Sequence, residues 1–417
     1  MPRHSALDTV RLTAGRPRLL VNRRALLFNL RQIRTFAGEG VRVCAVVKAD
    51  AYGHGARGVV DVLTNFYTPQ MPAPAIDAVA VASLAEADAL PDIDVPIFVL
   101  RPVECVYLGD NRAELEDALR RGVILSLIST AAVDDVSRLA ERLGVRANVQ
   151  VMLDTGMMRE GCDVAQFRKV IASVLARPSL SLRAIGTHFT DAEAGEEPYS
   201  DEQLRMFHET VDPLLPYLPP GIIKHAGNSG GTFFCEDDTL DMVRPGLSLY
   251  GLDPTGRPSV DRPLRPVAKW TAPLLSLRDA ASGSTVGYNR TWRAGKPTRL
   301  GLVPVGYADG YPRSLSNRGV VRLPAPATVD GVAPRDAFCP VVGRVSMDYL
   351  TIDLTDAPWA HPGDEVVLLD DDPTSPCSAY ALAQQTGTIP YEILCNIGPR
   401  IIRVGANPTD AEMTAAN

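Results

Sequence analysis

One lysine stands where a buried strand is expected to end. Residues 41–47, VRVCAVV, form a continuous apolar run, and Lys48 follows directly. Lysine is rarely buried, so the common role of such a residue is a solvated surface charge. The alternative is a nucleophile, because an amine that is desolvated near other cations is partly deprotonated at neutral pH and attacks carbonyl groups.

Further polar side chains follow the later apolar runs. They are Asp154 with Arg159, His188, His225 with Asn228 and Ser229, and Arg244. Taken singly, each is compatible with a turn or with a hydrogen-bonded core residue. Parallel barrel strands all end at one face, where the catalytic groups of barrel enzymes lie, so the whole set predicts a site at that face.

Two of these segments have the composition of a phosphate site. GNSGGT (227–232) and RPGLSLYG (244–251) lie at the ends of the seventh and eighth apolar runs, and small residues let backbone N–H groups approach an anion. The loops after strands 7 and 8 are the usual phosphate position in a barrel. A phosphate site and a strand-end lysine together suggest pyridoxal phosphate, whose aldehyde condenses with an amine.

The elements that would position these residues alternate between strands and helices. A helical segment such as 129–144 has Ser129 or Thr130 as its N-cap and Gly144 as its stop. Continuously apolar strands between helices predict an α/β fold, and eight in a row favour an N-terminal (β/α)8 TIM-like barrel over an open sheet. The apolar runs are 41–47, 78–83, 96–100, 123–128, 147–153, 182–188, 221–227 and 242–251.

The pattern changes after about residue 262. Short β-prone segments such as RLGLVPVGYADG and CPVVGRVSMDYLTIDL are separated by Pro, Gly and Asp turn signals. They predict a C-terminal all-β domain with a lone helix at 375–387. We therefore predict a pyridoxal-phosphate-binding barrel domain at 1–262 and a β-rich domain at 263–417.

Composition narrows the function classes. Charged residues make up 22% and hydrophobic residues 46%, which is ordinary for a globular protein, and a net charge of -7 argues against nucleic-acid or anionic-lipid partners. No apolar run is long enough for a membrane span, and no signal peptide is recognisable, so we expect a cytoplasmic protein. The seven cysteines form no CxxC and the six histidines no HxxxH, so neither disulfides nor a metal site are predicted.

The segment AVVKADAYGHG (45–55) closely resembles the cofactor-binding signature of alanine racemases, pyridoxal-phosphate enzymes of a barrel-plus-β-domain fold. The resemblance runs through nearly the whole chain and implies an isomerase that interconverts L- and D-alanine. Further matching motifs in the family's order are LDTGMMREG, GTHFTDAE, HAGNSGG, VRPGLSLYG, VGYNRTW, VPVGYADGYPR, GRVSMD and TIPYEILCNIGPR.

The resemblance implies four catalytic positions. Lys48 would form the aldimine with the cofactor and act on one face of the substrate Cα, and Tyr288 of the partner subunit would act on the other. Racemisation needs two such opposed groups, one to remove the proton and one to return it. His188 would hydrogen-bond the tyrosine, and Arg244 would face the pyridine nitrogen and disfavour its protonation.

The resemblance also implies binding roles. The phosphate ligands would be Tyr52, Ser229, Gly246, Leu247 and Tyr391. The substrate carboxylate would meet Arg159 and the backbone N–H of Met347, and the access path would be lined by Tyr307, Asp348 and again Tyr391. Because several of these positions fall in the β-rich domain, the resemblance implies a head-to-tail homodimer with active sites shared between subunits.

The sequence departs from the family at four positions. Many members carry a lysine, often carbamylated, seven residues before the Arg159 position, where it orients the arginine; this chain has Met152. Met158 and Asn289 replace common glycines, and Asp191 lies in an altered loop. None of these changes removes a predicted catalytic group, but they leave the substrate range open.

Three alternatives therefore stay open. They are a racemase of another or broader amino-acid range, such as serine, a related barrel-fold amino-acid decarboxylase, and a non-enzymatic pyridoxal-phosphate carrier. The Tyr288 motif argues against the decarboxylase. The region after residue 262 argues against the carrier, because such carriers lack a β-domain.

Overall fold

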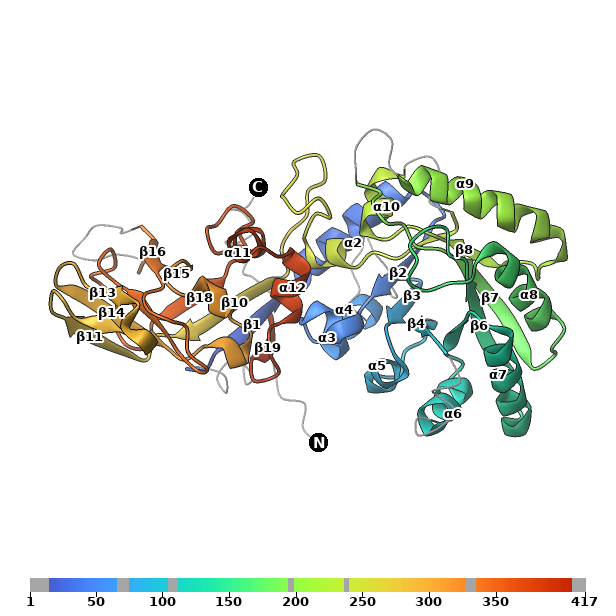
Figure 1. Ribbon diagram of the computed structural model, residues 1–417, viewed down its shortest axis with the longest axis horizontal. Helices are drawn as coiled ribbons and strands as arrows, with labels where there is room; N and C mark the ends of the chain where they lie inside the picture. Colours follow the sequence, from blue (N-terminus) through green and yellow to red (C-terminus); the bar gives the residue numbers. More distant parts are fainter. Residues whose placement is uncertain are drawn as a thin grey trace.

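The computed structural model describes residues 15–65, 75–103, 112–193, 199–235, 240–326 and 335–406. Eight parallel strands, β2 to β9, form a closed barrel, in which β9 pairs with β2 through Arg42 and Met242 (Figure 1). The predicted barrel is therefore confirmed. The strands are β2 (Arg42–Val46), β3 (Ala78–Val81), β4 (Ile97–Pro102), β5 (Ile124–Leu127), β6 (Ala147–Met152), β7 (Leu180–Gly186), β8 (Ile223–His225) and β9 (Met242–Val243).

Helices surround this barrel and bury the outer faces of its strands (Figure 1). All four residues of β3 and of β5 are buried, as expected for strands covered on both sides. The helix at 130–143 begins after Ser129, whose side chain accepts a hydrogen bond from Ala132 N–H, and ends at Gly144 in the left-handed conformation. The helices are α2 (Arg23–Ala37), α4 (Ala56–Asn65), α5 (Leu84–Ala89), α6 (Arg112–Arg120), α7 (Thr130–Leu143), α8 (Val164–Leu175), α9 (Tyr199–Val211) and α10 (Ser229–Phe234). The short segment α3 (Lys48–Tyr52) follows β2 and has a left-handed backbone.

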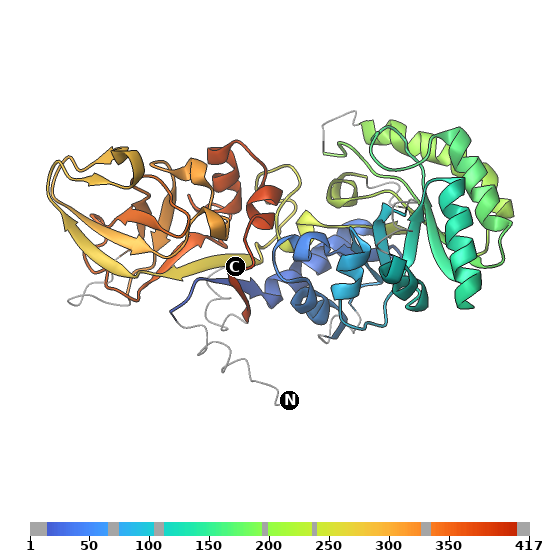
Figure 2. The same ribbon diagram turned by 60° about the horizontal axis from the view of Figure 1, so that its bottom comes forward.

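A second lobe, here called the β lobe (residues 15–22, 266–326 and 335–406), lies beside the barrel (Figures 1 and 2). Its main sheet has six strands in the order β16-β15-β18-β10-β1-β19, and a three-stranded sheet has the order β11-β14-β17. The strands are β1 (Arg18–Asn22), β10 (Ala268–Pro273), β11 (Ser276–Ala280), β12 (Thr285–Val286), β13 (Trp292–Arg293), β14 (Thr298–Val303), β15 (Val320–Leu323), β16 (Ala337–Pro340), β17 (Leu350–Asp353), β18 (Glu365–Leu369) and β19 (Ile402–Ala406).

The described chain passes through the β lobe before it enters the barrel. Strand β1 pairs with both β10 and β19, and α2 follows it directly. Residues 18–22 were predicted to belong to the barrel domain, because pairing with a strand about 250 residues away leaves no local signal. The domain boundary at residue 262 stays a prediction.

Two local predictions were wrong. The apolar run 242–251 is a strand only at Met242–Val243, and Leu247–Tyr250 form a buried 3-10 turn, η3, because burial alone does not distinguish a strand from a helical turn. The predicted lone helix is α11 (Ala379–Thr386), but a second helix, α12 (Pro390–Cys395), follows it. A proline at its first position suits a helix start.

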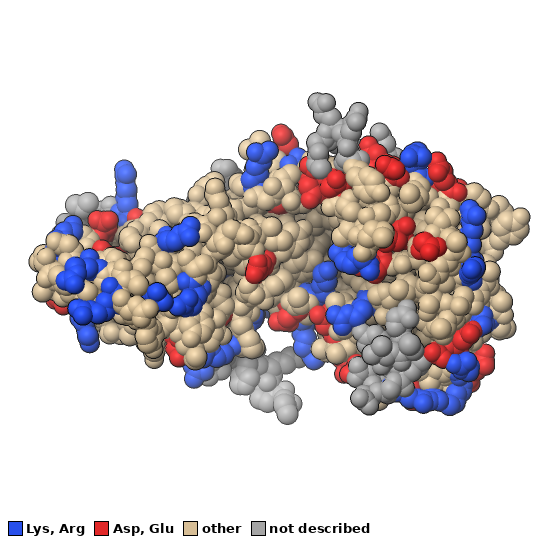
Figure 3. All heavy atoms as spheres, viewed as in Figure 1, with Lys and Arg blue, Asp and Glu red and all other residues tan. Residues whose placement is uncertain are grey.

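Two further observations concern the charge distribution on the surface and the apolar character of the helices. Acidic and basic side chains are interspersed over the barrel on the face shown in Figure 3. No helix within the described ranges is long and apolar enough to cross a membrane.

Candidate active site

A cavity of about 430 Å³ opens at the C-terminal ends of the barrel strands. It is lined by four cations, one histidine and one carboxylate: Lys48, Arg101, Arg159, Arg244, His188 and Glu160. All its lining residues come from the barrel. The face at which the sequence predicted a site therefore contains one, with Lys48, Arg159, His188 and Arg244 brought together.

The segment after Lys48 has an unusual backbone. Residues 49–52 all have φ between 52° and 55°, so they form a left-handed turn without a glycine. Such a conformation costs an L-residue roughly 1–2 kcal/mol. The turn is held by Glu86, whose carboxylate accepts a hydrogen bond from Ala49 N–H at 2.9 Å, and by Asp50, which accepts one from Ala56 N–H at 2.8 Å. Strain that neighbouring groups maintain is typical of functional sites.

The surroundings favour the neutral amine of Lys48. Burial, and next the positive charge of Arg159, lower the pKa of Lys48, while Glu160 and Glu86 oppose the shift. A larger fraction of neutral amine is what attack on a carbonyl group requires.

Arg244 is buried and fully engaged by neighbouring acceptors. Its guanidinium donates to Nδ1 of His225, to Nδ1 of His188 at 3.1 Å, and to the carbonyl oxygens of Thr187 at 2.9 Å and Ala226 at 3.1 Å. Burial lowers the pKa of Arg244 to about 10, so it stays charged at neutral pH. The arginine is thus a fixed cation at the floor of the cavity.

A chain of hydrogen bonds continues from Arg244 through the barrel interior. Nε2 of His225 donates to Gln150 Oε1 at 2.9 Å, Gln150 Nε2 donates to Ser126 Oγ at 2.7 Å, and Ser126 donates to the Val99 carbonyl at 2.6 Å. Because His225 accepts from Arg244 at Nδ1, its hydrogen must lie on Nε2. The chain therefore fixes the neutral tautomer of His225, whose pKa burial lowers well below its usual range.

His188 is kept neutral by the same surroundings. Burial first, then the charges of Arg244, Arg159 and Lys48, lower the pKa of His188 well below its usual range. Since Arg244 donates to Nδ1, the neutral ring carries its hydrogen on Nε2. That nitrogen lies 3.4 Å from Asn228 Nδ2, a longer contact than the one from Arg244 to Nδ1. A phenol oxygen that accepted from Nε2–H would be its better partner.

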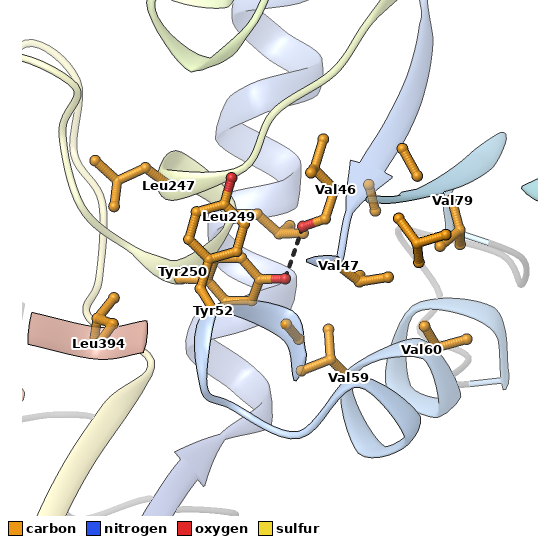
Figure 4. Packing of buried hydrophobic residues seen from close by; sticks show 14 of the residues in the cluster. Val46, Val47, Tyr52, Val59, Val60, Val79, Leu247, Leu249, Tyr250 and Leu394 are labelled. Carbon is orange, nitrogen blue, oxygen red and sulfur yellow. Dashed lines mark hydrogen bonds between the residues drawn. The ribbon is translucent and has the colours of Figure 1, made fainter. Parts of the chain in front are cut away.

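A polar cradle lies beside the cavity, where the sequence predicted a phosphate site. Ser229 Oγ lies 3.1 Å from Gly246 N and 3.2 Å from Ser248 N, and a Cβ added to Gly246 would lie 2.2 Å from the hydroxyl oxygen of Tyr52. Only glycine leaves this space open. Figure 4 shows Tyr52 packed near Leu247, with Tyr250 bonded to the Val46 carbonyl.

Tyr391 completes the cradle beside Tyr52, and both tyrosines are suited to donate hydrogen bonds to an anion. The rings of Tyr52 and Tyr391 lie 6.0 Å apart. Burial raises the pKa of Tyr52, and it raises that of Tyr391 to about 12, so both hydroxyls stay protonated. Protonated phenol groups and the hydroxyl of Ser229 are donors from which a phosphate oxygen accepts, so this cradle fits pyridoxal phosphate.

Nine predicted site residues do not line this cavity: the five expected at the phosphate, and Tyr288, Tyr307, Met347 and Asp348 of the β lobe. Tyr288 is 70% exposed, and Tyr307 and Met347 are also exposed. Tyr307 and Met347 are neighbours, since Ala308 N–H donates to the Met347 carbonyl at 3.0 Å, and Asp348 pairs with Arg400 at 2.9 Å. The structure of one chain therefore does not bring these β-lobe residues to the lysine.

The family departures are accommodated in different ways. Met152 is buried and lies beside the cavity, whereas Met158 is 87% exposed with a φ of 54°. Asn289 has a φ of 61°, a conformation that asparagine tolerates better than most residues, which explains how it replaces glycine. Glu160 was not predicted as a site residue, although a carboxylate next to Arg159 in a strand-end loop was a usable signal.

Comparison with protein families places both lobes. Residues 21–254 match the model "Alanine racemase, N-terminal domain", and residues 267–405 match "Alanine racemase, C-terminal domain". The alanine racemase of Halothermothrix orenii is 33% identical over 378 residues, covering 91% of this chain and 93% of the relative. That of Syntrophobacter fumaroxidans is 34% identical over 378 residues, with 90% and 93% covered.

Solved structures agree. The alanine racemase of Streptomyces coelicolor superposes with a TM-score of 0.80 at 31% identity, covering 95% of this chain and 100% of that one. The enzyme of Bartonella henselae, solved with covalently bound pyridoxal phosphate, has a TM-score of 0.75 at 29% identity, with 94% and 99% covered. On the strength of both lobes, this chain belongs to the alanine racemase family.

Proposed function

We propose that this chain is a pyridoxal-phosphate-dependent racemase that interconverts L- and D-alanine. The observation that carries this proposal is the cavity at the barrel's C-terminal face. There Lys48 has a pKa lowered by burial and by Arg159, and a cradle suited to bind a phosphate group lies next to it. Membership of the family supplies the reaction. We also propose a domain boundary at residue 262, which falls between the two family matches.

The chain's own residues would hold the cofactor as follows. The Lys48 amine would bind the carbonyl carbon of the cofactor, and the Arg244 guanidinium would face its ring nitrogen. When bound, pyridoxal phosphate supplies an aldehyde and an electron sink for negative charge at the substrate Cα. The phosphate would be held by Tyr52, Ser229, Gly246, Leu247 and Tyr391.

Proton transfer at Cα would use two residues on opposite faces. The neutral amine of Lys48 would remove or return the proton on one face, and the Tyr288 phenol on the other. His188, with its hydrogen on Nε2, would orient the phenol oxygen. The substrate carboxylate would meet Arg159 and the backbone N–H of Met347, which fixes the Cα–H bond toward the two bases.

The same residues require two copies of the chain. Tyr288, Tyr307, Met347 and Asp348 lie in the β lobe, and none of them lines the cavity of its own chain. In a head-to-tail homodimer, the β lobe of one subunit would cover the barrel face of the other. The exposed Tyr288 would then be buried in the partner's active site, and Tyr307 and Asp348 would line the access path.

A racemase of different or broader amino-acid range is the second candidate. Arg101 adds a cation to the cavity wall. Its positive charge favours a substrate with a polar or acidic side chain.

The direct test incubates L-alanine, L-serine and L-lysine separately with the purified protein and pyridoxal phosphate, followed by chiral chromatography. Fast formation of D-alanine alone supports the proposal. Faster racemisation of another amino acid supports the second candidate. Release of CO₂ without racemisation would contradict both and indicate a decarboxylase.

A further inference from the structure

Arg159 and Glu160 form a fork-to-fork ion pair at the edge of the cavity. Arg159 Nη2 donates to Glu160 Oε1 at 2.8 Å, and Nε donates to Oε2. Two parallel charge-assisted bonds fix the plane of a guanidinium as well as its position. Because they use the Nε and Nη2 edge, the edge formed by Nη1 and the second Nη2–H stays available for another carboxylate.

The loop that contains this pair, residues 154–162, is closed by backbone hydrogen bonds between its two ends. Asp154 N–H donates to the Cys162 carbonyl at 2.8 Å, and Cys162 N–H donates to the Met152 carbonyl at 2.8 Å. Within the loop, Asp154 Oδ1 accepts from Gly156 N–H at 2.8 Å. The backbone around Arg159 is therefore fixed, and the remaining freedom lies in its side chain, which is 51% exposed.

In the described part of the chain, the cavity lining contains no second anion for that side chain. The nearby cavity wall is Met152, whose thioether is only a weak hydrogen-bond acceptor. Among the described residues that line the cavity, Glu160 is the only carboxylate. Its charge acts on three cations there, since it contributes to the pKa shifts of Lys48, Arg159 and Arg244.

We propose that Glu160 is the positioning residue for Arg159, holding one edge of the guanidinium so that the other meets the substrate carboxylate. The inference rests on the proposed function. This role of Glu160 would explain how Arg159 is oriented in a chain that has Met152 in place of the lysine of many family members. Glu160 touches no reacting atom in this account and acts only through Arg159 and through its charge.

The first test is a double-mutant cycle on the holoenzyme with Glu160→Gln and Arg159→Lys. Glutamine keeps the size but loses the charge, and lysine keeps the charge but cannot form the fork. We expect Glu160→Gln to raise the KM for L-alanine about tenfold with a smaller change in kcat, because substrate positioning is lost. In the Arg159→Lys background, the same change should alter KM less than about twofold.

The matched control is Glu209→Gln on α9. Glu209 also pairs with an arginine, Arg205, at 3.2 Å, but it is exposed on the outer surface of the barrel. This variant should leave KM and kcat unchanged. An equal KM increase from Glu160→Gln in both backgrounds would overturn the inference.

The second test needs neither cofactor nor turnover. In the protein without cofactor, acetylation of the Lys48 amine is followed against pH by peptide mass spectrometry. Since Glu160 raises the pKa of Lys48, Glu160→Gln should move the labelling midpoint to lower pH, and Glu160→Asp should restore it. An unchanged midpoint would overturn the inference. If the wild type racemised no amino acid, the proposed function would fail, while this titration would still test Glu160.

Discussion

The hydrogen-bond chain behind Arg244 predicts a measurable cost for Gln150→Leu. Gln150 is fully buried in the barrel and is both the acceptor for His225 Nε2–H and the donor to Ser126 Oγ. Leucine has nearly the same size but provides neither group. His225 then loses its only acceptor in the chain of bonds, and Ser126 keeps its bond to the Val99 carbonyl.

The magnitude follows from the group left without a partner. A buried donor that loses its acceptor costs about 1–3 kcal/mol. The additional apolar surface of leucine offsets part of this, at roughly 0.8 kcal/mol per buried methylene. We expect a net loss of about 1–2 kcal/mol in the free energy of unfolding. His225 would also lose its fixed tautomer, which weakens its bond from Arg244.

The assay is equilibrium unfolding in urea at one protein concentration, since the stability of an oligomer depends on concentration. The control is Gln166→Leu, the same substitution at an exposed position whose side chain makes one bond, to the Ile128 carbonyl. That variant should lie within about 0.5 kcal/mol of the wild type. A Gln150→Leu protein as stable as the control would refute the role assigned to the chain of bonds.

Three further outcomes are expected. Ala49→Gly should raise the free energy of unfolding by up to about 1 kcal/mol in urea, because glycine adopts the left-handed conformation without strain, and a loss of stability would contradict this. Mixing inactive Lys48→Ala and Tyr288→Ala proteins, by unfolding and refolding them together, should restore about a quarter of the wild-type activity, since half the dimers are hybrids with one intact site each; no recovery would contradict a shared site. Stability should fall as pH drops below 6.5, because unfolded His188 and His225 take up protons there while their native pKa values lie well below, at up to about 1.4 kcal/mol per histidine and pH unit. Urea midpoints that are equal at pH 7 and pH 5 would contradict that account.

The sequence predicted the barrel well because its signals are local. Each apolar run is short and buried on both faces, and caps such as Ser129 and Gly144 mark helix ends through contacts within four residues. Polar residues at the ends of those runs, such as Lys48 and Arg244, could be assigned to the C-terminal face of the barrel, because their position relative to a strand end is also local. Topology then brings them together without further information.

Features that depend on distant contacts were not predictable. Nothing in the residue types of Ala49 to Tyr52 indicates a left-handed turn, because alanine disfavours it and the contact with Glu86 lies 37 residues away. The pairing of β1 with β10 is likewise nonlocal. The roles of Tyr288 and Met347 come from family resemblance, since no pattern within one chain connects them to Lys48.

Lysine attachment tests the central claim most directly. The chain has five lysines: Lys48, Lys169, Lys224, Lys269 and Lys296. The holoprotein is reduced with borohydride, digested and mapped by mass spectrometry, which locates the trapped pyridoxyl group. The account predicts the label on Lys48, the one lysine in the described chain that lines the cavity. A label on any of the other four, with Lys48 unmodified, would contradict it.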